Sequence, residues 1–247
     1  MPGRLITFNA MRALAFGAFA LTLAVTAGCK GPEGREVSAA PLSSLVVPAA
    51  PVEVPVPEAA PEEVIPGAPT ILARSTWSKQ APITPRLEAM GAITRLTIHH
   101  EGMDAERFAT QQDVIDQLRK IQTEHERRMH AGDIGYHYIV DCAGRVWEGR
   151  QLKYQGAHAG NGDANRGNIG IVLMGNFEIQ KPTAAQIASM KNLVNYLMVK
   201  YRIPVTRVYT HCEIRNKYDI GNTACPGRYL QREVDALRRQ LVVAEKK

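Results

Sequence analysis

The chain has 247 residues, of which 45% are hydrophobic and 22% are charged, and its formal net charge is +6. This length is enough for one hydrophobic core of ordinary size with appendages. A basic chain could bind nucleic acid, but the sequence shows no recognition helix and no platform of interleaved aromatic and basic residues. It also lacks a long cationic run, so we expect no nucleic-acid partner.

The first 28 residues have the pattern of an export signal. Arg4 and Arg12 precede an apolar run at residues 13–25, and small residues follow it, which is the order found in cleaved secretory signals. The apolar run is too short for a typical transmembrane helix. We therefore expect residues 1–28 to be removed on export.

The residues around this cleavage site resemble a bacterial lipobox. Thr26-Ala27-Gly28-Cys29 ends in a cysteine, although Thr26 stands where leucine is usual. The resemblance implies that Cys29 becomes the lipidated N-terminus; the alternative is an ordinary signal peptide with an incidental cysteine. Lys30 after the cysteine, rather than aspartate, resembles the signal for sorting to the outer membrane in cells that have one. We expect a protein of the bacterial cell envelope, anchored to a membrane by lipid and facing the periplasm.

Residues 29–71 form the expected linker. Proline, alanine, valine and glutamate dominate it, and prolines recur from Pro32 to Pro69. Such a stretch cannot form a packed core and favours extended, polyproline-like structure. We expect it to hold the folded domain, residues 72–247, away from a membrane.

The rest of the chain shows alternating patterns of strands and helices. Apolar residues at helical spacing predict helices over residues 108–122, 182–201 and 230–241. Thr183 and Gln186 form a capping box for the second of these. Strand-like runs occupy residues 95–100, 136–140, 145–148, 169–174 and 208–212, and a turn at 141–144 predicts one hairpin. We infer an α/β fold with a mixed central β-sheet flanked by helices.

Adjacent histidines on the first of these strands are candidates for a metal ligand. In Thr97-Ile98-His99-His100 the two histidines point to opposite sides of the strand, so both cannot reach one ion. His99 shares the polar face with Arg95 and Thr97. We therefore expect His99 to be the ligand and His100 to be a packed or hydrogen-bonded neighbour.

His211 and Cys225 complete a set of three ligands. On the predicted strand 208–212, His211 points away from Cys212, which argues against Cys212 sharing the metal. Cys225 lies in a loop before Pro226 and Gly227, where the backbone can turn a thiolate inward. Two imidazoles and one thiolate leave a fourth position open for water, which is typical of catalytic zinc. We therefore expect a Zn²⁺ site of the kind that hydrolases use.

Several stretches of the sequence together resemble one known family. They are Ala73-Arg74-Ser75-Thr76-Trp77, Ile98-His99-His100, Ile121-Gln122 with His125, Asp133-Ile134-Gly135-Tyr136-His137-Tyr138, residues 144–150, Gly156-Ala157-His158-Ala159, Asn168-Ile169-Gly170-Ile171 and Thr223-Ala224-Cys225-Pro226-Gly227. Their order and number are similar to those of the peptidoglycan recognition protein and zinc-dependent N-acetylmuramoyl-L-alanine amidase family. The resemblance implies zinc in a groove at one edge of the sheet, and hydrolysis of the amide bond between N-acetylmuramic acid and L-alanine in peptidoglycan.

The resemblance also implies roles for single residues. Zinc would be bound by the three residues chosen above, His99, His211 and Cys225. The family's catalytic tyrosine corresponds to Tyr136, which we expect on a strand beside that of His99; the alternative is a half-buried strand tyrosine. The family's supporting position two residues before the cysteine corresponds to Thr223, for which the alternative is a plain loop hydroxyl.

Other polar residues have weaker assignments. We expect His158 and Arg150 to face the groove that holds the glycan and the peptide. Cys142 and Cys212 are left over, and they could pair in an oxidising compartment.

Three classes of function remain open at this level. The complete ligand set with Tyr136 favours the amidase. Some family members lack the ligands and only bind peptidoglycan, so a non-catalytic receptor is the first alternative. A wall-anchoring lipoprotein is the second, and only the linker argues for it. In each case the expected partners are peptidoglycan or muropeptides and, through the N-terminal lipid, a membrane.

Overall fold

The structure is a computed structural model, and it describes residues 67–104, 108 and 110–245. The expected export signal, Cys29 and most of the expected linker lie outside these residues. The described part begins its regular structure with strand β1 (Ile71–Leu72), which pairs with a strand of the central sheet. Ile71, assigned to the linker from the sequence, is thus a sheet residue.

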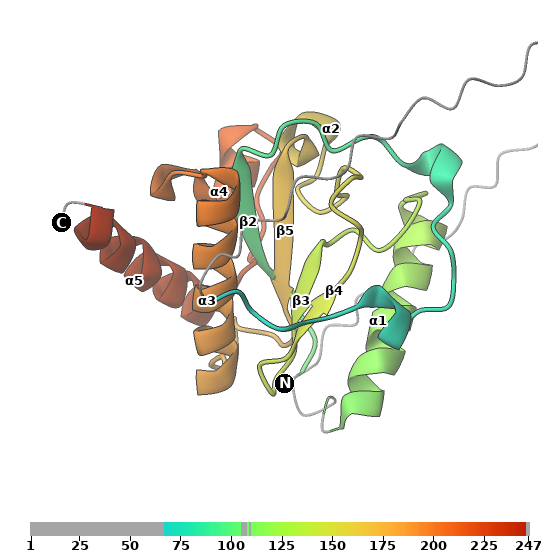
Figure 1. Cartoon of the computed structure of the whole chain (residues 1–247), viewed down its shortest axis with the longest axis horizontal. Helices are drawn as coiled ribbons and strands as arrows, with labels where there is room; N and C mark the ends of the chain where they lie inside the picture. Colours follow the sequence, from blue (N-terminus) through green and yellow to red (C-terminus); the bar gives the residue numbers. More distant parts are fainter. Residues whose placement is uncertain (1–66, 105–107, 109, 246–247) are drawn as a thin grey trace, which may run out of the picture. The chain divides into compact units, whose positions relative to one another are not determined.

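A six-stranded sheet forms the centre of the described domain (Figure 1). Its strand order is β1-β4-β3-β5-β2-β6. Only β3 and β4, joined by the predicted turn at 141–144, are antiparallel neighbours; the other pairs are parallel. The strands after β1 are β2 (Arg95–His100), β3 (Tyr138–Val140), β4 (Val146–Glu148), β5 (Asn168–Leu173) and β6 (Val208–Thr210). The predicted mixed sheet and its hairpin are confirmed.

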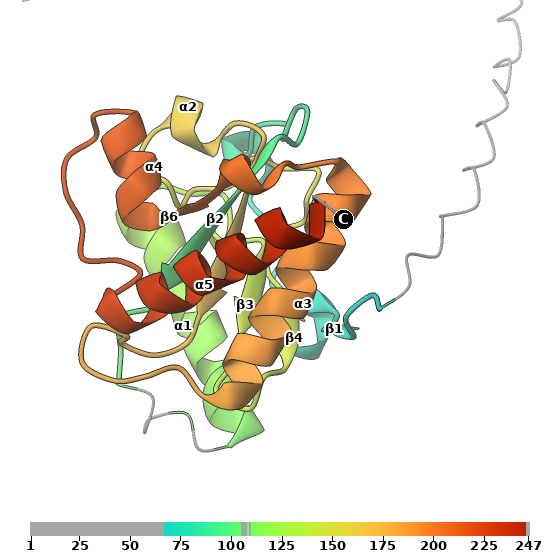
Figure 2. The same cartoon turned by 90° about the vertical axis from the view of Figure 1, so that its left-hand side faces the viewer.

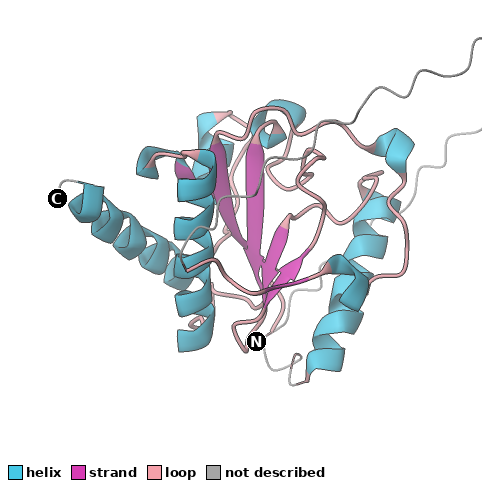
Figure 3. Ribbon diagram, viewed as in Figure 1, coloured by secondary structure: helices cyan, strands magenta, loops and turns pink. Residues whose placement is uncertain are grey.

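Helices cover both faces of this sheet (Figures 1 and 2). Helix α1 (Gln111–Arg128) lies on one face, and α3 (Ala184–Tyr201) and α5 (Arg228–Glu245) lie on the other. The short helices α2 (Gly162–Asn165) and α4 (His211–Lys217) lie at one end of the sheet (Figure 3). Short 3-10 turns occur at Arg74–Thr76, Thr84–Arg86 and Val205–Arg207.

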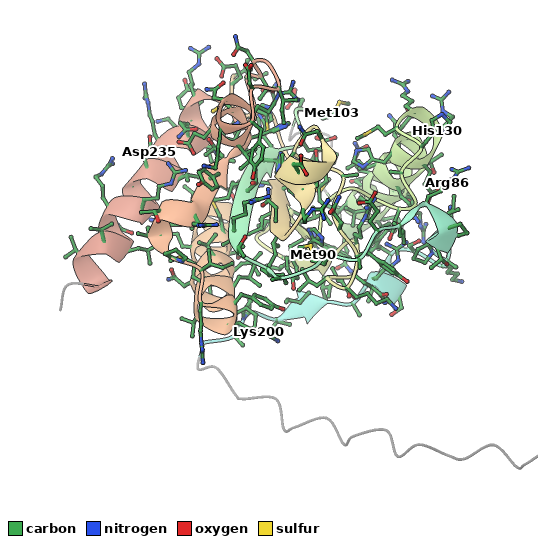
Figure 4. All side chains as sticks on the ribbon, turned by 90° about the horizontal axis from the view of Figure 1, so that it is seen from above. Arg86, Met90, Met103, His130, Lys200 and Asp235 are labelled. Carbon is green, nitrogen blue, oxygen red and sulfur yellow. The ribbon has the colours of Figure 1, made fainter. Side chains whose placement is uncertain are left out.

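Each face of the central strands packs into its own core, and side chains fill both interlayer spaces (Figure 4). Leu96 and Ile98 of β2 pack with residues of α3 and α5, whereas Val172 of β5 packs with residues of α1. Because side chains alternate along a strand, His99 projects toward the α1 face, as its sheet neighbour Val172 does. A histidine is thereby buried in the layer beside α1.

Capping residues determine where the long helices begin. The side chain of Thr183 accepts a hydrogen bond from the N–H of Gln186, so α3 begins as the capping box predicted. A second box, formed by Thr110 and Asp113, starts α1 at Gln111. The expectation for α1 was therefore wrong at both ends. The helix begins three residues later than residue 108, and it continues past residue 122 to Arg128 through a polar, ion-paired last turn.

Two predicted strands are shorter than expected, and both corrections affect candidate site residues. Strand β3 begins at Tyr138, so Tyr136 lies in the preceding loop, and β5 separates β3 from β2. Strand β6 ends at Thr210, and His211 begins α4. The carboxylate of Glu213 accepts a hydrogen bond from the N–H of Thr210 at 2.8 Å, which favours a helix start over a continued strand.

The length and apolar character of the helices of the described domain bear on whether they could span a membrane. None of those that the structure describes combines the length and the apolar character needed to cross a bilayer.

Candidate metal centre

Three side chains from distant parts of the chain meet beyond the ends of two neighbouring strands. His99 lies near the end of β2, His211 directly follows β6, and Cys225 lies in the loop before α5. The candidate ligand atoms of the three residues all lie within 4.8 Å of one another. Because β6 is the outermost strand on this side, the group lies near one edge of the sheet. The structure thus brings together the three residues expected to bind zinc.

The donor atoms of this group suit a metal ion. Nε2 of His211 is buried and has no hydrogen-bond partner among the residues that the structure describes, although buried polar atoms are normally paired. Nδ1 of His99 lies 3.8 Å from Sγ of Cys225. Burial, followed by the neighbouring His211 and His158, lowers the pKa of His99 well below its usual value. His99 is therefore a neutral imidazole, which is the form that binds metals.

The thiol of Cys225 completes the donor set. Burial raises its pKa to about 12, so without a cation beside it the thiol stays protonated. The backbone N–H of His100 donates a hydrogen bond to Sγ at 3.3 Å, which favours the thiolate. A bound metal ion favours the thiolate much more strongly, because coordinating thiols are deprotonated. We therefore expect metal binding to release a proton from Cys225.

One backbone and one side-chain hydrogen bond fix the segments that carry the two later ligands. The N–H of Cys212 donates to the carbonyl oxygen of Cys225 at 2.9 Å, which joins the first turn of α4 to the loop before α5. Glu213 in the same turn accepts a hydrogen bond from Nη1 of Arg238 on α5 at 2.9 Å. Helix α4 thus carries His211 and contacts Cys225 through Cys212, while Arg238 joins α4 to α5.

Tyr136 lies beside the group although it is not on a strand. Its ring centroid is 5.2 Å from that of His99 and 6.3 Å from that of His158, on which it stacks. Burial raises the pKa of the Tyr136 hydroxyl, and the nearby Cys225 and Glu101 raise it further. The hydroxyl is therefore protonated and able to donate a hydrogen bond.

Two further residues near the ligands have local structural contacts. Oγ1 of Thr223 accepts a hydrogen bond from the N–H of Cys225 at 3.2 Å, so the hydroxyl shapes the turn that presents the thiol. Nδ1 of His100 accepts a hydrogen bond from the N–H of Phe177 at 3.2 Å. His100 is thus the hydrogen-bonded neighbour that strand alternation predicted.

The part of the chain that carries these residues matches a known family. The sequence model of the N-acetylmuramoyl-L-alanine amidase family, Amidase_2, matches residues 89–228, which is more than half of the chain. The chain belongs to this family. All three members of the candidate metal group lie within the matched residues.

Relatives in this amidase family include both recognition proteins and a hydrolase. A peptidoglycan-recognition protein of Drosophila simulans is 32% identical over 165 residues, covering 66% of this chain and 85% of that protein. N-acetylmuramoyl-L-alanine amidase LysC from Clostridium intestinale is similar in structure, with a TM-score of 0.53 at 28% identity over 68% of this chain and 96% of LysC. Peptidoglycan recognition protein-LE, solved with tracheal cytotoxin, has a TM-score of 0.56 at 26% identity over 66% of this chain and 92% of that one.

His158 and Arg150, which we expected from the sequence to face a ligand groove, are both buried side chains of the amidase-family domain. His158 is 6% exposed, and its two ring nitrogens lie within hydrogen-bond distance of His99 and of the carbonyl oxygen of Asn168. Arg150 is 3% exposed, and it donates to the carbonyl oxygens of Ile134 at 2.8 Å and Asp133 at 2.9 Å. Arg150 therefore anchors the loop that leads to Tyr136.

The cysteines left over in the amidase-family domain do not form a disulfide. Among the residues that the structure describes, no disulfide joins Cys142 to Cys212. Sγ of Cys142 contacts the carbonyl oxygen of Met174, and Sγ of Cys212 lies 3.5 Å from Oε1 of Gln231. The disulfide between Cys142 and Cys212 that the sequence left open is therefore absent from the described residues.

The neighbours of His158 lie in a stretch of the sequence that resembles the family, but no role was expected for them. Asn168 and Gly170, both in β5, surround its ring: the Asn168 carbonyl is 3.1 Å from Nε2. A Cβ atom at Gly170 would lie 2.5 Å from the ring. A glycine between Ile169 and Ile171 in a buried strand was the available signal, because such a glycine often marks a close approach.

Proposed function

We propose that this protein is a zinc-dependent N-acetylmuramoyl-L-alanine amidase that hydrolyses the amide bond between N-acetylmuramic acid and L-alanine in peptidoglycan. The observation that carries the proposal is the convergence of two imidazoles, whose pKa values burial lowers, and one thiol within 4.8 Å. One of the imidazole nitrogens is buried and has no partner among the described residues. A zinc ion bound there would lower the pKa of a water molecule and polarise the substrate carbonyl. Three protein ligands are the usual number for catalytic zinc, whereas structural zinc usually has four.

The residues around the ligands supply the rest of the chemistry. Tyr136, held protonated by burial, is a hydrogen-bond donor for the negative charge that develops on the carbonyl oxygen during amide hydrolysis. Thr223 acts indirectly, since its hydroxyl holds the turn that presents Cys225. Arg150 also acts indirectly, through the loop that leads to Tyr136.

Family membership supports peptidoglycan as the substrate class. LysC is named as an amidase, and peptidoglycan recognition protein-LE was solved with a monomeric diaminopimelic acid-type peptidoglycan. The net charge of +6 suits an anionic cell wall. For the location we propose a lipid on Cys29 and a proline-rich tether that places the domain in the periplasm, anchored to the outer membrane. These features lie outside the described residues, and only the sequence supports them.

Digestion of purified peptidoglycan is the direct test. The protein is incubated with peptidoglycan in three conditions: as purified, with a chelator, and with the chelator followed by excess zinc. Mass spectrometry of the soluble products identifies the bond that is cut. We expect free peptides beginning with L-alanine in the first and third conditions and none in the second.

Two results would contradict the proposal in different ways. Retention on peptidoglycan without any released peptide, in protein shown to hold zinc, would indicate a non-catalytic receptor. Products that carry muramic acid still joined to L-alanine would indicate a different peptidoglycan hydrolase.

A further inference from the structure

His158 links a ligand of the candidate metal centre to the backbone of β5. Nδ1 of His158 lies 3.0 Å from Nε2 of His99. Nε2 of His158 lies 3.1 Å from the carbonyl oxygen of Asn168. His99 in turn directs its other nitrogen, Nδ1, toward Sγ of Cys225 at 3.8 Å. The three contacts form one continuous chain from a strand carbonyl to the metal site.

The chemistry of the groups fixes the direction of every hydrogen bond in this chain. A carbonyl oxygen only accepts, so Nε2 of His158 must carry the proton. In a neutral imidazole the other nitrogen is then an acceptor, so Nδ1 of His158 receives a hydrogen bond from Nε2–H of His99. Because Nε2 of His99 carries its proton, Nδ1 of His99 is left with a lone pair. One backbone carbonyl thus decides which nitrogen of His99 can bind a metal.

The surroundings of His158 hold its ring in this orientation. Cβ atoms added at Gly170 or Gly156 would each lie 2.5 Å from a ring carbon of His158, so both glycines are needed to admit the ring. The backbone N–H of His158 donates to Oδ1 of Asn165 at 3.0 Å. The ring of His137 contacts that of His158 edge-on, with centroids 5.8 Å apart. The ring therefore occupies a closely fitted slot.

We propose that His158 is a positioning residue, which fixes the tautomer and the orientation of His99 so that the Nδ1 lone pair faces Cys225 and His211. This positioning role is additional to the substrate contact that the sequence suggested for His158. The inference deepens the proposed function, on which it rests for the identity of the metal. Partners of this kind typically change metal affinity by about 10- to 100-fold when they are removed.

Two substitutions separate the hydrogen bond from the packing. His158→Phe keeps a planar ring in the slot and removes the acceptor. His158→Asn places its side-chain oxygen near the position of Nδ1 and so can still accept from Nε2–H of His99. We expect zinc affinity, measured by competition with a chromophoric chelator, to fall about 10- to 100-fold in the Phe variant and to stay within a few-fold of wild type in the Asn variant. Equal affinities in all three proteins would overturn the proposal.

The tautomer itself can be observed in protein freed of metal, whether or not the protein is an amidase. Nitrogen-15 NMR of the histidine rings distinguishes a proton on Nε2 from one on Nδ1. We expect His99 to carry its proton on Nε2 in wild type and in His158→Asn, and to lose this single tautomer in His158→Phe. A proton on Nδ1 of His99 in the wild type overturns the proposal, even if the Phe variant does not fold. Absence of zinc binding or of amidase activity in the wild type rejects the proposed function instead, and the tautomer still decides the role of His158.

Discussion

The hydroxyl of Tyr136 is the group beyond the three ligands on which the proposed chemistry most depends. The ring of Tyr136 lies beside that of His99 although it comes from a loop, and burial keeps the hydroxyl protonated. Such a donor contributes only if it meets charge that is absent from the ground state and develops in the transition state. Its loss should therefore reduce turnover without affecting metal binding.

We expect Tyr136→Phe to retain zinc and fold but to lose about a hundredfold or more in turnover. Phenylalanine preserves the ring contacts with His99 and His125 and removes only the donor. Zinc content, thermal midpoint and the rate of peptide release are measured for both proteins. Tyr209→Phe is the matched control, because that ring packs near Ile214 in a separate cluster. Near-normal turnover in a zinc-loaded Phe variant would reject the catalytic role of Tyr136.

Two cysteines close to each other in the fold allow a sharp test of the ligand set. The N–H of Cys212 bonds the carbonyl of Cys225, yet only Cys225 belongs to the candidate metal group. We expect one zinc per chain in wild type and in Cys212→Ser, and well below one in Cys225→Ser after dialysis against a weak chelator. Elemental analysis with protein quantification provides the measurement. Undiminished zinc in Cys225→Ser would show that the thiolate is not a ligand.

At the scale of strands and helices, strand alternation was enough to select His99 as the candidate ligand on β2. The surroundings of His211 and Arg150 depend on contacts between residues that strand alternation does not describe. Alternation works on β2 because this strand is regular throughout and its neighbours, β5 and β6, are parallel to it. It failed at His211, where Thr210 and Glu213 start a helix; Thr-x-x-Glu is a capping-box pattern that could have predicted this. The partners of the Arg150 guanidinium are backbone carbonyls, and no side-chain pattern in the sequence reveals such contacts.

Strand β5 must stay free of a side chain at Gly170 to admit His158. We expect Gly170→Ala to lower the free energy of unfolding by about 1–3 kcal/mol, because the added methyl group overpacks a rigid site. Gly162→Ala is the matched control, since the nearest atom to its Cβ, on the side chain of Gln155, is 4.0 Å away. Urea unfolding of both variants and the wild type measures the difference. Equal stability of the two variants would show that the residues around His158 can move to accommodate the added methyl group.

A second histidine joins β5 to a neighbouring loop and makes the stability of the fold depend on pH. Nδ1 of His137 accepts from the N–H of Gly170 at 3.0 Å, and Nε2 donates to the carbonyl of Tyr154, 3.1 Å away. Burial lowers the pKa of His137 from 6.5 to about 4. The unfolded chain therefore takes up a proton at higher pH than the folded one, and acid favours unfolding. The stability that neutral His137 contributes to the folded state is fully present above pH 6.5 and is lost as the pH falls toward 4.

We expect this group to lower the stability of the metal-free protein by about 2 kcal/mol between about pH 7 and pH 5. His137→Asn keeps an acceptor for the N–H of Gly170 but removes the titrating ring, so its stability should depend less on pH. Urea unfolding across this pH range compares the two proteins. The same slope in both would mean that His137 does not titrate in this range.

For the molecule as a whole, the candidate metal centre unites segments that are far apart in the sequence. Its ligands come from β2, the start of α4 and the loop before α5, so the site exists only when these three segments are assembled on the sheet. The sequence predicted this set of residues, but their mutual distance follows from the parallel pairing of β2 with β6. The proposed amidase function further requires that the assembled domain reach peptidoglycan, and we propose that the N-terminal residues provide this reach.

We expect Cys29 to carry lipid and Cys29→Ala to release the protein from membranes. The basis is Thr26-Ala27-Gly28-Cys29 followed by a proline-rich stretch. A lipid chain contributes about 0.8 kcal/mol per buried CH₂ group, so stable anchoring needs more than one chain. Mass spectrometry of the N-terminal peptide and fractionation of membranes test the two parts separately. Cys142→Ala is the control, because it also removes one thiol but leaves the N-terminus intact. An unmodified N-terminal residue would contradict the expected lipid on Cys29. A Cys29→Ala protein that stays with the membranes would show that a lipid on this residue is not what anchors the protein.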